Sequence, residues 1–165
     1  MEQKGNKMFT TKHLDKVLGE VRGTKKNSPF SPKKSMLTYR LSKMSRNYRG
    51  TTIEMMLRDH FVKKGCVVKH IGNSNRYDLY VNGKKIEVKS ALARPKKVRG
   101  EIKHEYKFAH VCPAKFEKLI MVYVSPEGLE MRTMDSRTVA KKLGVKNKHK
   151  ALYAGYKKLG KVLAA

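Results

Sequence analysis

Apolar positions spaced three and four residues apart predict helices in the N-terminal half of the chain. Residues 11–21 have this spacing and are predicted to form a short amphipathic helix. A longer stripe runs through residues 51–64, where these apolar side chains would share one helix face: Ile53, Met56, Leu57 and Phe61. Gly65 directly follows the stripe and is a typical helix stop. Residues 22–35, rich in Pro, Ser and Lys, favour a linker or mobile arm between the two helices.

Alternating or continuously apolar runs predict strands in the middle of the chain. The predicted strands cover residues 66–71, 76–81, 84–90, 119–124 and 129–134. The dipeptide Asn82-Gly83 joins the second and third of them, and it is the strongest short signal for a two-residue hairpin turn. Residues 93–100 are basic and turn-prone, and residues 101–111 are expected to form a further strand or an irregular edge.

The tail beyond residue 135 has the pattern of helices. Asp135 or Ser136 is the expected N-cap of the first helix, and a second helix is expected near residues 151–163. Residues 136–145 also resemble the start of a helix-turn-helix, although an ordinary lysine-bearing amphipathic helix fits the same pattern. The predicted fold class is α/β, with a mixed sheet of about five strands flanked by helices. We divide the chain into a basic N-terminal helix and arm (1–44), a core (45–134) and basic C-terminal helices packed on the core (135–165).

Charge points to the class of partner. The chain has 39 Lys and Arg against 13 Asp and Glu, a formal net charge of +26 over 165 residues. A field of this sign attracts polyanions, so nucleic acid is the first partner to consider. The arm at residues 22–35 is then either a solvated linker or a segment that contacts DNA. The charge alone does not distinguish an enzyme that acts on nucleic acid from a basic protein that only binds it.

Several other classes of protein are disfavoured by the sequence. The first twenty residues lack the apolar stretch of a signal peptide, and the longest apolar run, residues 119–124, is too short to span a bilayer. Cys66 and Cys112 form no CxxC pair, the histidines lack metal-ligand spacing, and there is no phosphate-binding GxxxxGK[ST] loop. We therefore expect an intracellular protein with no membrane, disulfide, zinc or ATP-driven function.

The hairpin around Asn82-Gly83 carries the candidate chemistry. Its two-residue turn fixes a register that sets Asp78 directly opposite Glu87. Side chains alternate along a strand, so both carboxylates share a face with Lys89, while the other face is apolar. Opposed like charges destabilise a strand pair, and Lys89 or a divalent cation would offset the repulsion. Two converging carboxylates are ligands that Mg²⁺ accepts while it keeps several waters.

The alternative is a surface carboxylate pair neutralised by the surrounding lysines. Glu-x-Lys occurs four times in the chain, beginning at Glu2, Glu87, Glu101 and Glu105. Only the occurrence at Glu87 follows an Asp-bearing strand across a tight turn and has an apolar face behind it. The context of this tripeptide therefore distinguishes it, and the tripeptide alone does not.

Between residues 45 and 134 these features resemble the PD-(D/E)xK nuclease superfamily, which includes many restriction enzymes and the archaeal Holliday junction resolvases. In that family a glutamate-bearing helix precedes a hairpin with an Asp on one strand and (Asp/Glu)-x-Lys on the next. Here Glu54, Asp78 and Glu87-Val88-Lys89 occupy those places, although Tyr77 stands where the family signature has Pro. The resemblance implies a restriction endonuclease-like core that cleaves DNA with Mg²⁺, or with Mn²⁺ in its place.

The resemblance also implies a role for each of these residues. Asp78 and Glu87 would bind the metal, and Val88 is counted with them as a metal ligand. Lys89 would orient or activate the attacking water, and Glu54 would support the metal site from its helix. Basic residues near these positions are expected to contact DNA: Arg46, Arg49, Arg76, Lys85, Arg94, Lys96, Lys97 and Arg99.

The form of the DNA substrate stays open at this point. A structure-specific nuclease of the junction-resolvase type is favoured, because the chain is small and basic and has no obvious separate recognition domain. Restriction-type and homing-type endonucleases remain alternatives. A homodimer is expected if both strands of a duplex are cut, because one active site cuts one strand at a time.

Overall fold

The computed structural model describes residues 28–72, 77–146, 149, 151–155 and 159. The helix predicted at residues 11–21 lies outside these ranges. In chain order the described elements are α1 (Met36–Lys43), α2 (Arg46–Lys63), β1 (Val68–His70), β2 (Leu79–Val81), β3 (Lys84–Leu92), β4 (Arg94–Val98), β5 (Glu101–Glu105), β6 (Lys107–Val111), the 3₁₀ turn η2 (Pro113–Lys115), β7 (Lys118–Val124), β8 (Leu129–Asp135), α3 (Ser136–Leu143) and β9 (Leu152–Gly155). None of the described helices is long and apolar enough to cross a membrane.

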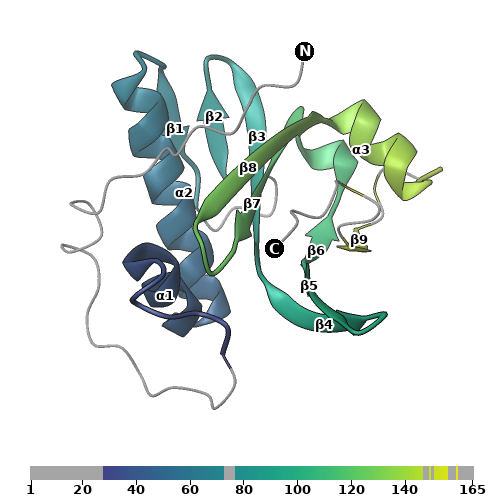
Figure 1. The fold of residues 1–165 in the computed structure, drawn as a ribbon. Helices are drawn as coiled ribbons and strands as arrows, with labels where there is room; N and C mark the ends of the chain where they lie inside the picture. Colours follow the sequence, from purple (N-terminus) through teal and green to yellow (C-terminus); the bar gives the residue numbers. More distant parts are fainter. Residues whose placement is uncertain (1–27, 73–76, 147–148, 150, 156–158, 160–165) are drawn as a thin grey trace.

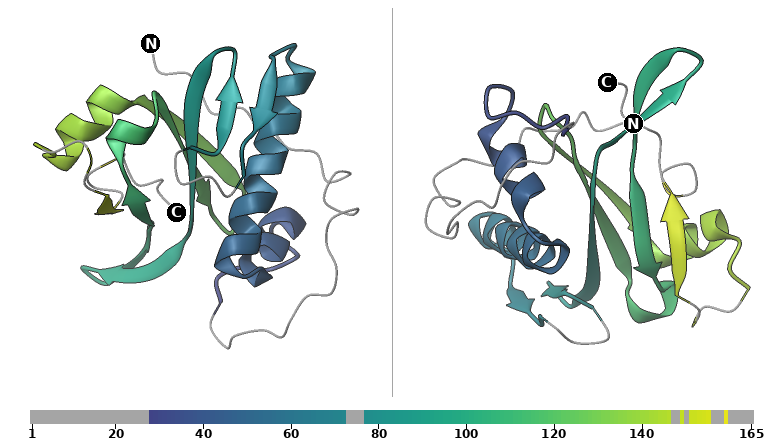
Figure 2. Two further views of the ribbon diagram at one scale, coloured as in Figure 1. Left: turned by 180° about the vertical axis from the view of Figure 1, so that it is seen from behind. Right: turned by 90° about the horizontal axis from the view of Figure 1, so that it is seen from below.

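A five-stranded mixed sheet forms the centre of the molecule, as predicted. Its strand order is β1-β2-β3-β7-β8, in which β3 and β7 run parallel and the other neighbours are antiparallel. Helices α1 and α2 lie on one side of the sheet, and β6, β9 and α3 lie on the other (Figure 2). Strand β7 is therefore covered on both faces, and all its residues after Lys118 are buried. This accounts for the continuous apolar run in its sequence.

Helix α2 extends the predicted helix by five residues at its N-terminal end. Ser45 caps it, with its hydroxyl accepting a hydrogen bond from the backbone N–H of Tyr48 at 3.3 Å. Ile53 and Leu57 from the predicted stripe are buried against the sheet. Helix α1 was not predicted, and it packs beside α2 in Figure 1, after a similar serine cap at Ser35.

The C-terminal part differs from the sequence prediction. Helix α3 forms as expected, with the Asp135 side chain accepting a hydrogen bond from Thr138 N–H. Residues 152–155, however, form strand β9 instead of part of a second helix. Strand β9 pairs antiparallel with β6, which buries Ala154 and leaves Tyr153 exposed. Pairing with a distant strand thus outweighs the local helical pattern. The helix-turn-helix alternative also fails within the described residues, because α3 is followed by β9.

Residues 94–111 contain more regular secondary structure than their sequence indicated. The segment expected to be turn-like contains β4, and the expected single strand divides at Tyr106 into β5 and β6. Strands β4 and β5 pair only with each other, forming a separate two-stranded ribbon. At its base, Tyr106 and Phe108 pack edge-on against Tyr123 of β7, with ring centroids 5.0 and 5.2 Å away. These aromatic contacts anchor the base of the ribbon to the core.

Candidate active site

The hairpin that joins β2 and β3 has the predicted register. Val81 pairs with Lys84, and Leu79 pairs with Ile86, across the turn at Asn82 and Gly83. Asn82 and Gly83 have φ angles of 45° and 82°, which an Asn-Gly turn tolerates at little cost. The predicted apolar face of the hairpin is also correct, because Leu79, Val81, Ile86 and Val88 are buried.

Asp78 lies just before β2, and its backbone and side chain continue the hydrogen bonds between β2 and β3. Its backbone N–H donates to Ile86 O at 3.0 Å, and its Oδ2 accepts a hydrogen bond from the Val88 N–H at 2.7 Å. Asp78 therefore sits beside Glu87, as the register implied, but it is not part of strand β2. Beyond Ile86, β3 has no strand neighbour on this edge among the described residues.

The carboxyl group of Asp78 therefore occupies an open strand edge. In a strand, the N–H and C=O of one residue point to the same side, so the Val88 carbonyl faces the edge where Val88 N–H meets Asp78. This places a backbone oxygen at the same edge as the Asp78 carboxylate. The sequence prediction grouped Val88 with Asp78 and Glu87, and the backbone geometry agrees with that grouping.

Three acidic side chains interact electrostatically at this edge. Burial, followed by the charges of Glu87 and Glu54, raises the pKa of Asp78 to about 7, against the opposing effects of Val88 N–H and Lys89. Burial and the Glu54 charge also raise the pKa of Glu87, while Lys89 acts to lower it. The structure thus brings Glu54, expected only as a supporting residue, close enough to affect both other carboxyl groups. A cation at this place would relieve their mutual repulsion.

Lys89 is the cation that the chain itself supplies. Its Nζ pairs with Glu87 Oε1 at 2.5 Å, and only 25% of the Lys89 side chain and 13% of the Glu87 side chain are exposed. The tripeptides at Glu101 and Glu105 also form ion pairs, since residues two apart on a strand share a face. The Glu87–Lys89 pair differs from them in its burial and in the acidic groups beside it.

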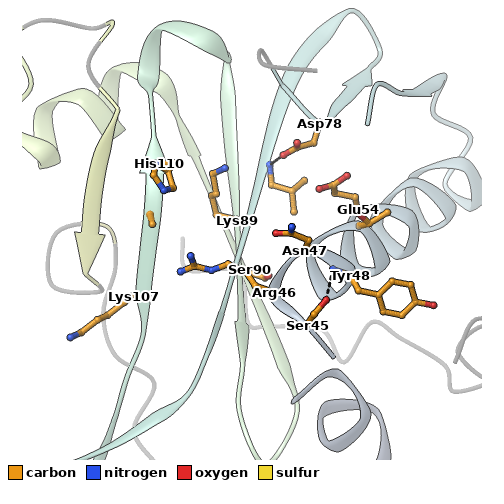
Figure 3. Close-up of a pocket in the computed structure, with 14 residues that line it drawn as sticks. Ser45, Arg46, Asn47, Tyr48, Glu54, Asp78, Lys89, Ser90, Lys107 and His110 are labelled. Atoms are coloured by element: carbon orange, nitrogen blue, oxygen red, sulfur yellow. Dashed lines mark hydrogen bonds between the residues drawn. The ribbon is translucent and has the colours of Figure 1, made fainter. Parts of the chain in front are cut away.

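Glu54, Asp78 and Lys89 border a cavity of about 640 Å³ between α2 and β6. Glu54 and Asp78 lie on one side, Lys89 and Ser90 rise from β3, and Lys107 and His110 form the opposite wall (Figure 3). The first turn of α2 forms a further part of the lining. The remaining lining residues are Ser45, Arg46, Asn47, Tyr48, Gly50, Thr51, Val88 and Ala109. Glu87 is not among them, and it reaches the site through its contact with Lys89.

His70 is a neighbour of the site that the sequence analysis missed. Its Nε2 lies 2.9 Å from Glu54 Oε2, and both side chains are mostly buried. The β1–β2 register sets His70 opposite Leu79, next to Asp78, so a prediction that included β1 in the hairpin sheet would have found it. Lys107 and His110, by contrast, gave no sequence signal, because β6 reaches the cavity only through the tertiary fold.

Arginines from two elements meet near the cavity. Burial lowers the pKa of Arg49, and the charges of Arg46 on α2 and Arg94 on β4 lower it further. Arg49 Nη1 donates to Met44 O at 3.3 Å, whereas its Nε is buried without a hydrogen-bond partner in the described structure. A partly buried guanidinium group with like charges acting on it is a place where an anion would be bound favourably. Of these three residues predicted to contact DNA, Arg46 lines the cavity, and the charges of Arg46 and Arg94 act on Arg49.

The other residues predicted to contact DNA lie elsewhere. Lys96, Lys97 and Arg99 are exposed on the β4–β5 ribbon. Lys85 lies outside the cavity lining, with its Nζ 5.8 Å from the centre of the Tyr77 ring. Arg76 falls outside the described residues.

The acidic groups are chemically suited to a hard divalent cation. Within the described ranges, no three His, Cys, Asp or Glu side chains are arranged as a ready-made metal cage. Mg²⁺ commonly uses only one or two carboxylates and completes its shell with water and substrate oxygens. The pair of Asp78 and Glu87, with the Val88 carbonyl at the same edge, provides oxygen donors of that kind. The residues present therefore fit the ion that the sequence suggested.

Comparisons with known proteins give no further guide to this site. A scan against protein-family models, a search of curated proteins and a search of solved structures each found no match.

Proposed function

We propose that the protein is a metal-dependent nuclease that hydrolyses phosphodiester bonds in DNA. One observation carries this proposal: Glu54, Asp78 and Glu87 are held together, partly buried and mutually repelling, beside Lys89 in a strongly basic chain. Burial and like charges both disfavour the ionised forms of Asp78 and Glu87, and the opposing effects of Val88 N–H and Lys89 leave both pKa values raised. Arrangements of this kind are typical of sites that bind a cation or perform acid–base chemistry.

In this proposal Asp78 and Glu87, with the Val88 carbonyl, would hold Mg²⁺ or Mn²⁺. The bound ion would supply charge stabilisation at the scissile phosphate and a more acidic water. Glu54 orients the acidic cluster from α2, and His70 holds Glu54 through its hydrogen bond. The role of Asp78 also requires its deprotonated form, which a neighbouring cation favours.

Lys89 acts on the water and the phosphate. Its ammonium group is fixed by the ion pair with Glu87 and retains further N–H donors that can point into the cavity. Those donors would orient the attacking water and offset negative charge on the phosphate oxygens. The water oxygen forms a new bond to phosphorus and gives up a proton to the solvent, one ester P–O bond breaks, and the leaving oxygen takes up a proton from the solvent. The products are a phosphate monoester end and a hydroxyl end.

The arginines and the net charge account for substrate binding. Arg46, which lines the cavity, and Arg49 and Arg94, whose charges interact, would contact phosphates of the bound DNA. Contacts of this kind hold the backbone but carry no base sequence. Within the nuclease class we favour a structure-specific enzyme of the junction-resolvase type with a restriction endonuclease-like core. Restriction-type and homing-type cleavage remain the alternatives, and a homodimer would be needed to cut both strands.

A cleavage assay tests the proposal. The full-length protein is incubated with supercoiled plasmid, linear duplex and a four-way junction, each with Mg²⁺, with Mn²⁺ and with EDTA. We expect nicking or cutting that requires the metal, and preference for the junction would identify the substrate type. Binding to all three DNA forms without metal-dependent cleavage would instead identify a non-catalytic DNA-binding protein, the alternative that the net charge alone supports.

A further inference from the structure

Beyond Arg94 at its base, the β4–β5 ribbon is an exposed surface that the proposed chemistry does not use. All of β4 is exposed, and Figures 1 and 2 show the ribbon extending away from the sheet. Two apolar side chains near its end are open to solvent: Val98 is 36% exposed and Ile102 is 67% exposed. A two-stranded ribbon has little stability of its own in water, so this one depends on its anchored base.

The two faces of the ribbon differ in charge. On one face, Lys96 pairs with Glu105 at 3.2 Å, and Lys103 pairs with Glu101 at 3.3 Å. The register places Lys97 opposite Ile102 on the other face, where no residue is acidic. Among the described residues no carboxylate pairs with Lys97, so its charge is available to a partner. On the first face both lysines are paired with carboxylates of the ribbon, and the second face presents a cation beside an apolar side chain.

The tip of the ribbon carries a residue in an unfavourable backbone conformation. Arg99 and Gly100 form a two-residue turn with φ angles of 51° and 85°, close to those of Asn82 and Gly83. Left-handed conformations are disfavoured for most residues with a Cβ, and Asn is the residue that such turns usually use. Arg99 is exposed and makes no ion pair in the described structure. Its presence there places a guanidinium group at the far end of the ribbon without improving the fold.

The base of the ribbon is fixed relative to the candidate active site. Strand β4 begins two residues after the end of β3, the strand that carries Lys89, and β5 leads into Lys107 on the cavity wall. A partner held by the ribbon would therefore be held in a defined position relative to Lys89. With a rise of about 3.3 Å per residue, five residues extend over ~17 Å, roughly the length of 5 base pairs.

We propose that this ribbon inserts into the major groove of duplex DNA on one side of the cleaved bond, with Arg99 leading. The proposal rests on the proposed nuclease function and adds how the duplex is held. The major groove is wide enough for a two-stranded ribbon, and its phosphate walls would attract Lys97 and Arg99. Ile102 lies on the same face as Lys97 and would contact the apolar edges of the bases.

Hydroxyl-radical footprinting and affinity measurements in EDTA on a duplex of about 30 base pairs test this inference. Arg99→Asn is the test variant, and Lys103→Ala, on the ion-paired face, is its matched control. Arg99→Asn should weaken binding about fivefold or more and shorten the footprint on one side only. Its melting temperature should equal or exceed that of the wild type, because Asn suits the turn. Lys103→Ala should leave affinity within about twofold and the footprint unchanged.

The outcomes separate this inference from the proposed function. If the wild type cleaves with Mg²⁺ but Arg99→Asn keeps the full footprint and affinity, the ribbon proposal is wrong and the nuclease proposal stands. If the wild type binds with a one-sided footprint that Arg99→Asn shortens, yet never cleaves, the nuclease function is wrong and the ribbon still holds DNA. If Arg99→Asn changes the mass in solution from dimer to monomer while the footprint per copy is unchanged, the ribbon is a subunit contact and the proposal fails.

Discussion

Two hairpins of this protein share a turn and a tripeptide, yet they are put to different uses. The β2–β3 hairpin turns at Asn82-Gly83 and the β4–β5 hairpin at Arg99-Gly100, with similar positive φ angles. Each turn is followed on the second strand by Glu-x-Lys. Glu87 is only 13% exposed and lies among other carboxylates, whereas Glu101 is 73% exposed and pairs with Lys103. The same local sequence therefore yields a candidate site in one place and a solvated ion pair in the other.

The difference arises from what lies behind each hairpin. Strand β3 is held by β7 on one edge and covered by packed elements, so its one carboxylate, Glu87, loses water and interacts strongly with the charged groups beside it. Among the described residues β4 is exposed along its whole length and β5 over its first three residues, so solvent screens the charges of this hairpin. Burial, rather than the tripeptide, converts an ordinary ion pair into a group of perturbed carboxyl groups.

The largest expected difference between the two hairpins is in the cleavage rate after Lys89 or Lys103 is replaced. Lys89→Ala should reduce the cleavage rate by about 10² or more, because a positioned donor is lost beside the reacting phosphate. DNA affinity should change little, since one of 39 basic residues is removed. Lys103→Ala, from the matching tripeptide, should cleave at the wild-type rate. Single-turnover cleavage measures both, and a wild-type rate for Lys89→Ala would exclude the proposed role of Lys89.

The pH dependence of stability should differ between the two hairpins. In the native metal-free protein Asp78 keeps its proton up to about pH 7, against an ordinary value of 3.8 in the unfolded chain. The unfolded state therefore loses this proton first. The contribution of Asp78 to the free energy of unfolding is largest below about pH 4 and is lost as pH rises to about 7.

Asp78→Asn should remove this loss and stabilise the metal-free protein at pH 8 by about 1 to 4 kcal/mol. The Asn side-chain oxygen can still accept the Val88 N–H bond. Glu101→Gln is the control and should leave the pH profile unchanged. Urea unfolding in EDTA from pH 4 to 8 measures both variants, and added Mg²⁺ should raise the melting temperature of the wild type only. A variant less stable than the wild type at pH 8 would mean that Asp78 serves a structural role.

Replacing Asn82 in the β2–β3 turn, for example by the Arg that the β4–β5 turn has, should have the smallest effect of the three changes, and the effect is on stability. Asn82 Oδ1 accepts a hydrogen bond from the Val67 N–H at 2.8 Å, and Asn82 N–H donates to Val67 O at 2.9 Å. Asn82→Arg would lose the first bond and introduce a residue that disfavours positive φ, so we expect destabilisation of about 1 to 2 kcal/mol. Asn82→Gly, which keeps the turn and loses only the side-chain bond, should cost less. Thermal unfolding compares the two, and equal melting temperatures would show that turn strain is unimportant here.

The parts of the fold that rest on local patterns were predictable from the sequence. The stripe in α2, the apolar runs of β7 and β8, and the turn at Asn82-Gly83 each report on residues close together in the chain. The turn fixed the register, and the register brought Asp78, Glu87 and Lys89 together. Most of the acidic part of the candidate site therefore follows from the short stretch of sequence between residues 78 and 89.

The remaining parts depend on contacts between distant segments. Strand β4 is exposed on both faces, so it lacks the alternation that reveals a half-buried strand. Strand β9 exists because β6 offers it an edge. The contact of His70 with Glu54 and the wall formed by Lys107 and His110 arise only when β1, α2 and β6 are packed on the sheet. No periodicity within these segments encodes such contacts.

The open edge of β3 has a further consequence for solubility. An unpaired strand edge can add a strand from another molecule, which is a common route to aggregation. In the described structure the Val88 N–H donates to the Asp78 carboxylate, so it is not available to another strand. Lys89 and Arg94 add positive charges on and just after β3. A foreign strand would have to displace the carboxylate and approach those cations. The Asp78 carboxylate therefore disfavours the addition of a foreign strand at Val88, on a stretch of β3 that has no partner among the described strands.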